Sequence, residues 1–428
     1  MRSRSRSHRR RRPQLTPTLA ISLGLAVSVG LAGCVAAPAT ETAGTTSVPA
    51  DRVPGELVDD RVVTAIAREL FTERRLKAAV GQVLQDGEVI AEFQLGEAMT
   101  GEDATLDASF RNGAVAIAYI GVALLRLHQR GVLDMDAPVA EWMPELPDSD
   151  LITPRQLITM TSGIPDYVPD TDFQEQFFAD PYQAWTAEQL LGFGLAQPRT
   201  FAPGENWDYS HSGIVALGEI MSRAADAPLA EILRDEVLEP AGLTRTVSEQ
   251  TAAIPSPYLH GFDAERGVYE DATFWNPSWT LAEGAVQTST IPDVAKSFDA
   301  IIGRGELLEP ESWAELISND LVGFGTPLEG CRTCHTLNER YAYSIGVVLR
   351  GDWISQNPLF GGYAASVLTL PATTAEDGSS LTVAVAVTFH EDAIEDWTGT
   401  LPNRADELAT MIATELRPDQ APPAFTFG

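Results

Sequence analysis

The chain has 428 residues, of which 44% are hydrophobic, and its 29 lysine and arginine residues face 60 acidic ones, for a formal net charge of −31. Such an acidic chain is not expected to bind nucleic acid, because neutralising phosphates requires a cationic surface. The length and apolar content are sufficient for one large domain or for two closely packed subdomains.

The N-terminal segment has the features of an export signal. Seven arginines lie within Met1–Arg12, and an apolar run follows over Leu19–Ala32, shorter than the roughly 20 residues that span a bilayer. The run ends in Leu-Ala-Gly-Cys, a pattern typical of a bacterial lipobox. We therefore predict that residues 1–33 are a lipoprotein signal peptide, cleaved before Cys34, which carries the lipid and holds the protein on the outer face of the cell membrane.

An ordinary signal peptide with an incidental cysteine is the alternative, and the export route, general secretory or twin-arginine, stays open. Removing residues 1–33 takes away seven arginines and no acids, so the formal net charge falls from −31 to −38. Residues 34–60, rich in Ala, Thr and Pro, are predicted to form a flexible linker. We place one domain at residues 61–415 and a C-terminal tail at residues 416–428.

The predicted elements begin with a hairpin over Ala79–Leu95, where apolar and polar residues alternate around Asp86-Gly87. A mostly apolar helix follows over Ala114–Gly131, with its glycine as the stop signal. A short helix is predicted over Thr153–Met160, because Pro154 suits its first turn. The aromatic and acidic stretch Asp166–Thr200 is predicted to form short helices and loops that build a lid or wall.

Two further helices and three strands complete the prediction. The helices lie at Ser210–Ala225 and Leu229–Leu238, and the strands at Ala342–Leu349, Tyr363–Leu370 and Leu381–Thr388. Strands at both ends with helices between them indicate an α+β fold, an antiparallel sheet flanked by helices and completed by both termini, with an all-helical subdomain inserted.

The two cysteines after Cys34 form a Cys-x-x-Cys pair. For an exported protein we expect a local disulfide between Cys331 and Cys334. Together with His335 they also match the c-type haem attachment pattern, and zinc would need two more ligands. No neighbouring pattern supports either alternative, so we expect neither metal nor cofactor.

Several stretches in a fixed order carry a family resemblance. They are Phe110-Arg111-Asn112-Gly113, Gly131-Val132-Leu133-Asp134-Met135-Asp136-Ala137-Pro138-Val139, Ile152-Thr153-Pro154-Arg155-Gln156-Leu157-Ile158, Thr161-Ser162-Gly163-Ile164, Phe201-Ala202-Pro203-Gly204, Tyr209-Ser210-His211 and Leu238-Glu239-Pro240-Ala241-Gly242-Leu243. Over about Arg61–Thr414 the chain resembles the serine β-lactamase and D,D-carboxypeptidase superfamily, particularly its class C β-lactamase and esterase-like branch.

The resemblance implies a serine acylated during catalysis. In this superfamily a Ser-x-x-Lys motif opens a helix and places serine and lysine on one face, and the lysine accepts the serine proton. A Tyr-x-Asn motif contributes proton transfer and substrate positioning. A Lys-Thr-Gly or His-x-Gly motif on a strand beside the cleft helps to hold the substrate and the oxyanion.

This chain departs from the first motif at both essential positions. Ala114 stands where the resemblance places the serine, and Ile117 where it places the lysine. The chain has two lysines, Lys77 and Lys296, and neither follows a serine by three residues. Acyl-enzyme chemistry at this position is therefore not expected.

The other two motifs are changed as well. Tyr209 keeps the tyrosine of the second motif, while His211 replaces its asparagine. Where the third motif is expected, the chain has no lysine or histidine and reads Asn357-Pro358-Leu359-Phe360-Gly361-Gly362. The candidate ligand contacts of a cleft that has lost its catalytic residues are Tyr209, His211, Phe360, Gly361 and Gly362.

Three hypotheses remain open at this stage. A pseudoenzyme would use the cleft to bind, by family analogy, a cell-wall peptide or small acyl ligand. An active hydrolase (a β-lactamase, D,D-carboxypeptidase or esterase) would need another nucleophile, for which Ser109, Ser162 and Ser210 are the candidates. A structural or partner-binding module would have its cleft closed by Ile117, Leu359 and Phe360. A cavity bounded by Ala114, Tyr209, His211 and Phe360 would favour the first. The sequence does not indicate the oligomeric state.

Overall fold

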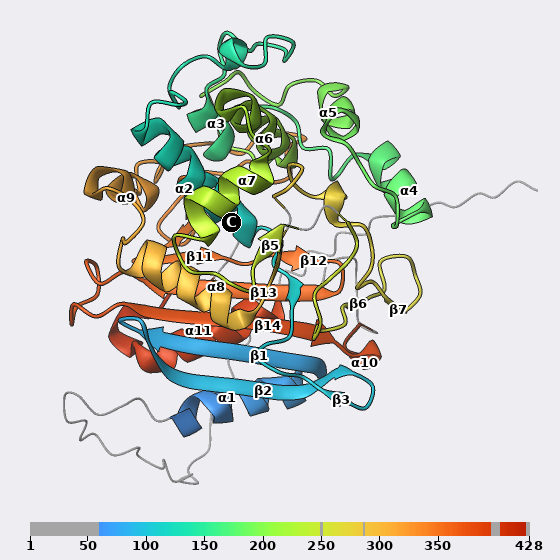
Figure 1. The fold of residues 1–428 in the computed structure, drawn as a ribbon, viewed down its shortest axis with the longest axis vertical. Coiled ribbons are helices and arrows are strands. Elements are labelled where there is room, and N and C mark those ends of the chain that lie inside the picture. Colours follow the sequence, from blue (N-terminus) through green and yellow to red (C-terminus); the bar gives the residue numbers. More distant parts are fainter. Residues whose placement is uncertain (1–59, 249–250, 286, 395–402, 425–428) are drawn as a thin grey trace, which may run out of the picture. The chain divides into compact units, whose positions relative to one another are not determined.

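The computed structural model describes residues 60–248, 251–285, 287–394 and 403–424 (Figure 1). All of them belong to the unit formed by residues 55–428. The predicted signal peptide, Cys34, nearly all of the predicted linker and the last four residues of the predicted tail lie outside the described residues. Within the described ranges, no helix combines the length and the apolar character that crossing a membrane requires.

An antiparallel sheet forms the centre of this unit and confirms the predicted α+β class. Its strand order is β3-β2-β1-β14-β13-β11-β10-β9, and β12 pairs with β13. The N-terminal strand β1 lies beside the late strand β14, so strands from both ends of the unit complete the sheet, as predicted. The strands are β1 (Leu76–Gln85), β2 (Glu88–Met99), β3 (Glu102–Asp103), β9 (Ala342–Tyr343), β10 (Val348–Arg350), β11 (Trp353–Gln356), β12 (Leu359–Phe360), β13 (Tyr363–Leu370) and β14 (Leu381–Phe389).

Two small sheets accompany the main one. One has the order β4-β8-β5 and lies where the chain enters the helical part, and the other is the hairpin of β6 and β7. Their strands are β4 (Phe110–Arg111), β5 (Val247–Ser248), β6 (Phe262–Asp263), β7 (Glu270–Asp271) and β8 (Gln287–Ser289).

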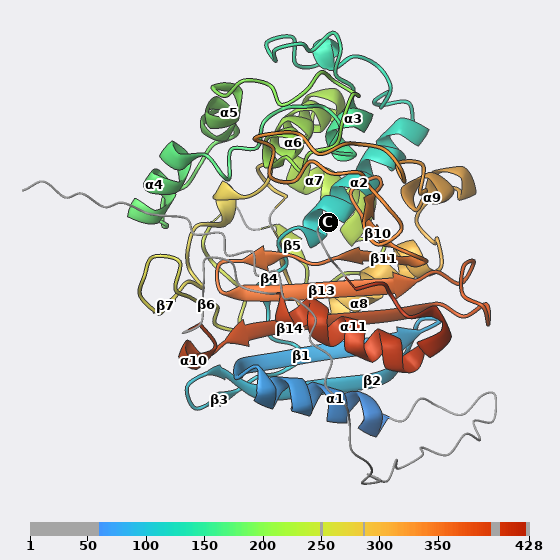
Figure 2. The ribbon, with the colours of Figure 1, turned by 180° about the vertical axis from the view of Figure 1, so that it is seen from behind.

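Helices cover both faces of the main sheet and form a separate helical layer (Figures 1 and 2). The α-helices are α1 (Asp60–Glu73), α2 (Val115–Gln129), α3 (Pro154–Ile158), α4 (Thr171–Ala179), α5 (Ala187–Leu195), α6 (His211–Ala225), α7 (Leu229–Leu233), α8 (Ile291–Phe298), α9 (Pro310–Leu316), α10 (Glu391–Ile394) and α11 (Arg404–Leu416). Short 3₁₀ or π segments cover Val139–Glu141, Arg234–Leu238, Pro277–Trp279, Asp299–Gly303 and Pro418–Gln420.

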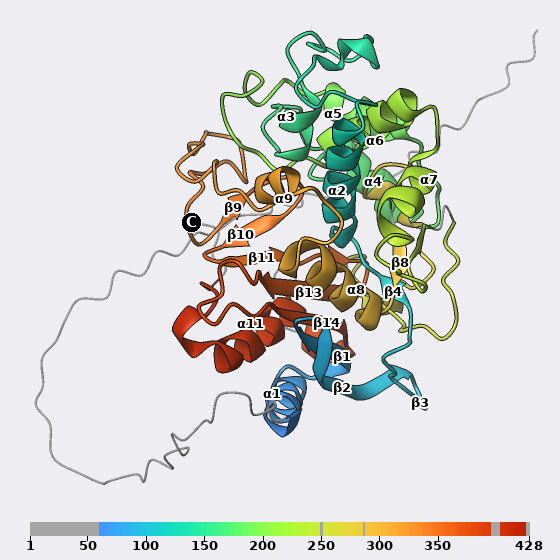
Figure 3. The same cartoon turned by 60° about the vertical axis from the view of Figure 1, so that its left-hand side comes forward.

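The two faces of the sheet belong to two different apolar cores. Successive side chains of a strand point to opposite faces, so Ala78 and Val80 of β1 join the core with α2 and α8, while Ala79 and Val83 join the core with α1 and α11. Figure 3 shows α11 and α8 on opposite sides of β13. Because both faces are covered, β13 and β14 are buried along their whole length.

The predicted hairpin and first long helix are confirmed. Asp86 and Gly87 both have positive φ, the conformation of a tight hairpin turn, and Gln85 pairs with Glu88 across it. Helix α2 ends before Gly131, whose φ of +66° matches its predicted role as the stop.

One predicted strand is wrong. Residues 342–349 form two strands, β9 and β10, paired antiparallel around a turn at Gly346. Gly346 has a φ of +73°, and a Cβ atom there would lie 2.5 Å from the carbonyl oxygen of Ile117. The mostly apolar composition of this stretch therefore reflects the burial of both short strands and of the turn rather than one continuous strand.

Candidate functional site

A cavity of about 810 Å³ opens beside the N-terminus of α2. Ala114, Tyr209, His211 and Phe360 all line it, together with Leu359. The size falls in the range of small-molecule sites, roughly 300–1,000 Å³. The four residues that would bound a retained cleft are thus brought together around open space.

The start of α2 is held close to the sheet edge. Gly113 has a φ of +50°, and a Cβ atom there would lie 2.7 Å from Cβ of Pro358, so only glycine allows this approach. Ala114 follows as the helix N-cap and makes no side-chain hydrogen bond. Ile117, one turn later, is fully buried in the core that contains α2 and is absent from the cavity lining. Ile117 packs in the core behind the cavity lining and does not fill the cavity.

Tyr209 lies in the loop that leads into α6. Its backbone N–H donates to Oγ1 of Thr333, 3.3 Å away, and its ring meets His211 edge-on, with 5.1 Å between the ring centroids. Burial, followed by the negative charge of Asp166, raises the pKa of the Tyr209 hydroxyl above its usual value. The hydroxyl therefore stays protonated near neutral pH and can donate a hydrogen bond.

His211 is the first residue of α6 and is paired with a carboxylate. Its Nδ1 lies 3.0 Å from Oδ2 of Asp166, and its backbone N–H donates to Oδ1 of the same aspartate, 3.2 Å away. The two side chains are 19% and 15% exposed, and both line the cavity. This Asp166–His211 pair is the main feature of the site that sequence reasoning missed. Because Asp166 and His211 are 45 residues apart, no local sequence pattern connects them. A histidine at the asparagine position of the second motif was the one available signal.

The loop between the two cysteines forms another part of the wall. The structure contains the predicted disulfide between Cys331 and Cys334. Thr333, between them, lines the cavity and donates to the carboxylate of Asp208. Burial raises the pKa of Asp208, and the Thr333 hydrogen bond opposes that shift.

Strand β12 supplies the apolar wall. Phe360 stacks on Trp279 with 5.5 Å between ring centroids, and Leu359 is 42% exposed within the lining. Gly361 and Gly362 turn the chain into β13 at positive φ and are not among the described lining residues. The suggested closure of the cleft by Leu359 and Phe360 does not occur, because both side chains border the cavity and leave it open.

The far end of the cavity reaches α11. Arg350 of β10 and Asp406 of α11 lie there, with Nη1 and Oδ1 2.8 Å apart. Arg350 also donates to the carbonyl oxygen of Pro423, 2.9 Å away, so part of the predicted tail packs against this wall. Ala424, the last described residue, lines the cavity as well.

The three serines considered as alternative nucleophiles lie away from the lining. Ser210 caps α6 by accepting the N–H of Gly213, 3.1 Å away, and Ser162 accepts the N–H of Ile164, 3.4 Å away. Ser109 is fully buried and bridges to Tyr258. Within the described part of the chain, none of these serines borders the cavity.

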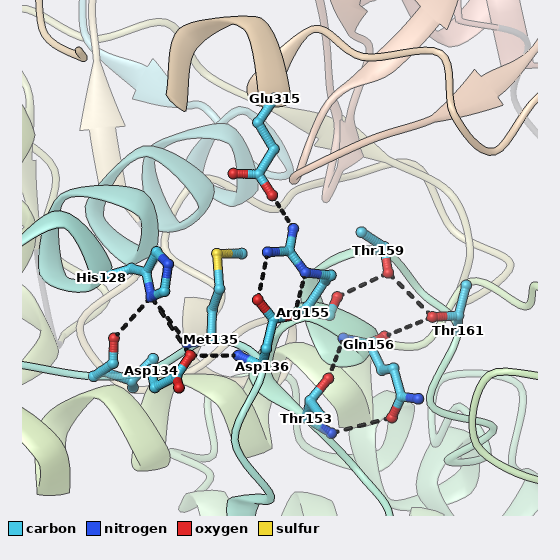
Figure 4. A network of polar contacts seen from close by, with 11 residues as sticks. His128, Asp134, Met135, Asp136, Thr153, Arg155, Gln156, Thr159, Thr161 and Glu315 are labelled. Carbon is cyan, nitrogen blue, oxygen red and sulfur yellow. Dashed lines mark hydrogen bonds and ion pairs between the residues drawn. The ribbon is translucent and has the colours of Figure 1, made fainter. Parts of the chain in front are cut away.

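Two groups of potential metal ligands occur among the described residues. In the group of Asp208, Cys331 and Cys334, the sulfur atoms form the disulfide. The other contains His128, Asp134 and Asp136 (Figure 4). There Arg155 holds Asp136 through two hydrogen bonds of 2.5 and 2.8 Å. Both groups thus have structural partners, and neither borders the cavity as a set.

Comparison with known proteins agrees with this architecture. A family model described as Beta-lactamase matches residues 63–406. The chain is similar to esterase EstB of Burkholderia gladioli, at 27% identity over 298 residues, 62% of this chain and 76% of the esterase. It is also similar to penicillin-binding protein 4* of Bacillus subtilis (strain 168), at 25% identity over 168 residues, 38% of this chain and only 36% of that protein.

Solved structures show the same fold. A D-stereospecific amidohydrolase from Streptomyces sp. matches with a TM-score of 0.63 and 22% identity, covering 79% of this chain and 99% of that one. The D-amino acid amidase from Ochrobactrum anthropi SV3 matches with a TM-score of 0.67 and 19% identity, covering 84% and 99%. At these identities the similarity concerns the fold.

Proposed function

Because the chain belongs to the beta-lactamase family, we propose that it is a ligand-binding member of that family without acyl-enzyme chemistry, tethered through a lipid on Cys34 to the outer face of the cell membrane. One observation carries the proposal: the cavity is open beside Tyr209, while Ala114 and Ile117 occupy the positions of the nucleophile and its base.

The size of the chemical loss supports binding over acyl transfer. In serine hydrolases, loss of the nucleophile or its base lowers turnover by roughly 10⁶-fold. Here both side chains are apolar, and the candidate replacement serines cap helices or lie buried outside the lining. The open cavity beside Tyr209 argues against a purely structural module, whose cleft would be closed by Ile117, Leu359 and Phe360.

The charges around the cavity favour a ligand without strong net charge. The charged lining residues of the described chain are Asp166, His211, Arg350, Arg404, Asp406 and Glu407. They pair with one another as Asp166–His211, Arg350–Asp406 and Arg404–Glu407. Apolar side chains such as Leu359 and Phe360 offer contact for an acyl group, so a small acyl compound or a neutral part of a cell-wall peptide is the proposed ligand.

Thermal shift of the purified chain with a panel of muropeptides and acyl compounds tests the binding proposal. We expect at least one compound to raise the melting temperature. Ala114→Phe should abolish the shift, because the new ring fills the cavity. Val89→Phe, at an exposed position of β2 outside the lining, is the matched control. No shift with any compound, or a shift retained in Ala114→Phe, would contradict the proposal.

Labelling with a fluorophosphonate or a penicillin probe tests the hydrolase alternative. We expect no covalent adduct by mass spectrometry. An adduct that disappears on replacing Ser109, Ser162 or Ser210 would establish a serine hydrolase instead.

The anchor is tested separately. Incorporation of labelled palmitate into the expressed chain should be lost in Cys34→Ser, and that variant should leave the membrane fraction. Equal labelling of both forms would refute lipid attachment at Cys34 and would leave the binding proposal untouched.

A further inference from the structure

The Asp166–His211 pair presents one free ring position to the cavity. Asp166 accepts from the backbone N–H groups of both His211 and Val168, each 3.2 Å away, which fixes the carboxylate. The carboxylate in turn holds Nδ1 of His211 at 3.0 Å. An imidazole bound this way at Nδ1 carries its proton there and directs the lone pair of Nε2 elsewhere. Since His211 lines the cavity, Nε2 is the ring nitrogen available to a bound molecule.

Two other features of the same wall suit a developing negative charge. The Tyr209 hydroxyl, kept protonated by burial and by Asp166, belongs to the ring that meets His211 edge-on. The N-terminus of the 15-residue helix α2 ends at Ala114 on the lining, and the positive end of a helix dipole stabilises anions. Ala114 lines the cavity with a methyl group, so no hydroxyl stands there to compete with water as the nucleophile.

We propose that this cleft slowly hydrolyses activated esters by direct attack of water, with His211 as the general base and Asp166 as the residue that positions it. This activity goes beyond the binding role proposed above. It needs a bound acyl compound but no acyl-enzyme.

The reaction balances without any further reactant. Nε2 of His211 takes a proton from water while the water oxygen forms a bond to the ester carbonyl carbon. The carbonyl electron pair moves to oxygen, which accepts a hydrogen bond from the Tyr209 hydroxyl. When the carbonyl re-forms, the bond to the leaving oxygen breaks, and that oxygen receives the proton from His211. The products are a carboxylic acid and an alcohol.

The expected rate is modest. General-base catalysis by a positioned side chain typically contributes about 10²–10⁴-fold. Only esters with good leaving groups should therefore react at a measurable rate. Penicillin hydrolysis at the speed of an acylating enzyme is not expected.

Hydrolysis of p-nitrophenyl acetate and butyrate by the purified full chain tests the proposal. We expect a linear time course without a burst, unaffected by a fluorophosphonate. His211→Ala should lower the rate above background by about 10²-fold or more, and added imidazole should restore part of it. Imidazole rescue separates a chemical role of the ring from a structural one.

Matched variants complete the test. His128 also places Nδ1 near a carboxylate, 3.7 Å from Asp134, but lies outside the cavity lining, so His128→Ala should keep the full rate. Asp166→Asn should lower kcat more than it changes KM, because it disturbs the tautomer of His211 while the side chain that lines the cavity keeps nearly the same size. If His211→Ala does not fold by circular dichroism, His211→Gln replaces it.

The outcomes separate the two proposals. An unchanged rate in the folded His211 variant, no rescue by imidazole, or a burst that reports an acyl-enzyme would overturn direct hydrolysis. Thermal shifts with non-hydrolysable acyl compounds report binding independently, so their loss would instead refute the proposed binding role.

Discussion

Two carboxylates, Asp136 and Asp208, show how differently the chain treats its scaffold and its cleft. Asp136 lies in the segment that follows α2 and is held by the guanidinium of Arg155, which also pairs with Glu315 (Figure 4). The hydrogen bond from Arg155 lowers the pKa of Asp136. Asp208, behind the cleft wall, has a threonine hydroxyl as its hydrogen-bond donor, and burial raises its pKa.

The two carboxylates differ in whether an arginine is placed beside them, and the chain has few cationic residues to place. With 29 lysine and arginine residues against 60 acids, arginines such as Arg155 and Arg350 pair with carboxylates that lie far from them in the sequence and connect separate parts of the fold. Among the described lining residues, the cationic side chains are Arg350 and Arg404, each paired with a carboxylate, and His211, which is cationic only when it is protonated. Ion pairs occur both in the scaffold and in the cavity wall, whereas neither of the two lysines of the chain, Lys77 and Lys296, is among the described lining residues.

Removal of the buried carboxylate at the α11 end of the cavity should give the largest effect. Asp406 and Arg350 are 10% and 1% exposed in their side chains and lie 2.8 Å apart. Asp406→Ala should lower the free energy of unfolding by about 3–5 kcal/mol, because a buried guanidinium loses its carboxylate. Urea denaturation measures it. Glu145→Ala, which breaks the exposed pair with Arg223, is the control and should cost less than about 1 kcal/mol. Equal costs would show that burial does not separate the two classes of ion pair.

The disulfide beside the cleft should have a smaller effect. Its loop is short, so chain entropy gives about 2 kcal/mol of stabilisation. Replacing both Cys331 and Cys334 by serine should lower the melting temperature accordingly. Because Thr333 accepts the N–H of Tyr209, the same variant should also weaken ligand binding. Reduction of the wild-type chain by dithiothreitol should reproduce both effects, and the serine variant should no longer respond to the reductant. Unchanged stability on reduction would mean that the loop is held by its other contacts.

The opposite pKa shifts predict opposite pH dependences. A lowered pKa means that Asp136 stabilises the fold above the unfolded value of about 3.9 and loses this contribution as pH falls through its folded pKa. A raised pKa means that Asp208 contributes stability below about pH 3.9 and loses it as pH rises through its folded pKa.

Asp136→Asn should therefore lower the free energy of unfolding near pH 7 and lower it less near pH 3.5. The loss near pH 7 should stay under about 1 kcal/mol, because the Asp136 side chain is 57% exposed. For Asp208→Asn, the change in the free energy of unfolding should be more favourable near pH 7 than near pH 3.5, because the charged, buried carboxylate is removed. Chemical denaturation at both pH values decides the signs. The same sign for both variants would contradict the contrast between scaffold and cleft.

The sequence predicted the turns and helix ends that depend on the backbone preferences of single residues. The turn at Asp86-Gly87, the stop at Gly131 and the proline-started helix at Pro154 follow from backbone preferences of individual residues, and all three are present. The departure from the first motif at Ala114 and Ile117 is visible in four consecutive residues, and the absence of acyl-enzyme chemistry that we expect from it stays a prediction.

What the sequence could not predict depends on packing between distant segments. Asp166 and His211 meet because the loop after α3 folds against the start of α6, and no periodicity links them. The split of residues 342–349 into β9 and β10 follows from the close approach of Gly346 to Ile117. Leu359 and Phe360 border the cleft, and no local pattern in the sequence distinguishes this placement from one that fills it.

The smallest expected effect concerns a substitution that restores a serine at the position of the nucleophile. Ala114→Ser adds one oxygen atom on the cavity lining, where a hydroxyl can reach solvent, so the free energy of unfolding should change by less than about 0.5 kcal/mol. The serine should still resist a penicillin probe, because Ile117 supplies no base and lies fully buried behind it. Mass spectrometry after prolonged incubation checks this. Labelling of Ala114→Ser that disappears in the double variant with His211→Ala would show that the Asp166–His211 pair can activate a hydroxyl as well as water. In that case the missing serine alone would separate this cleft from an acylating one.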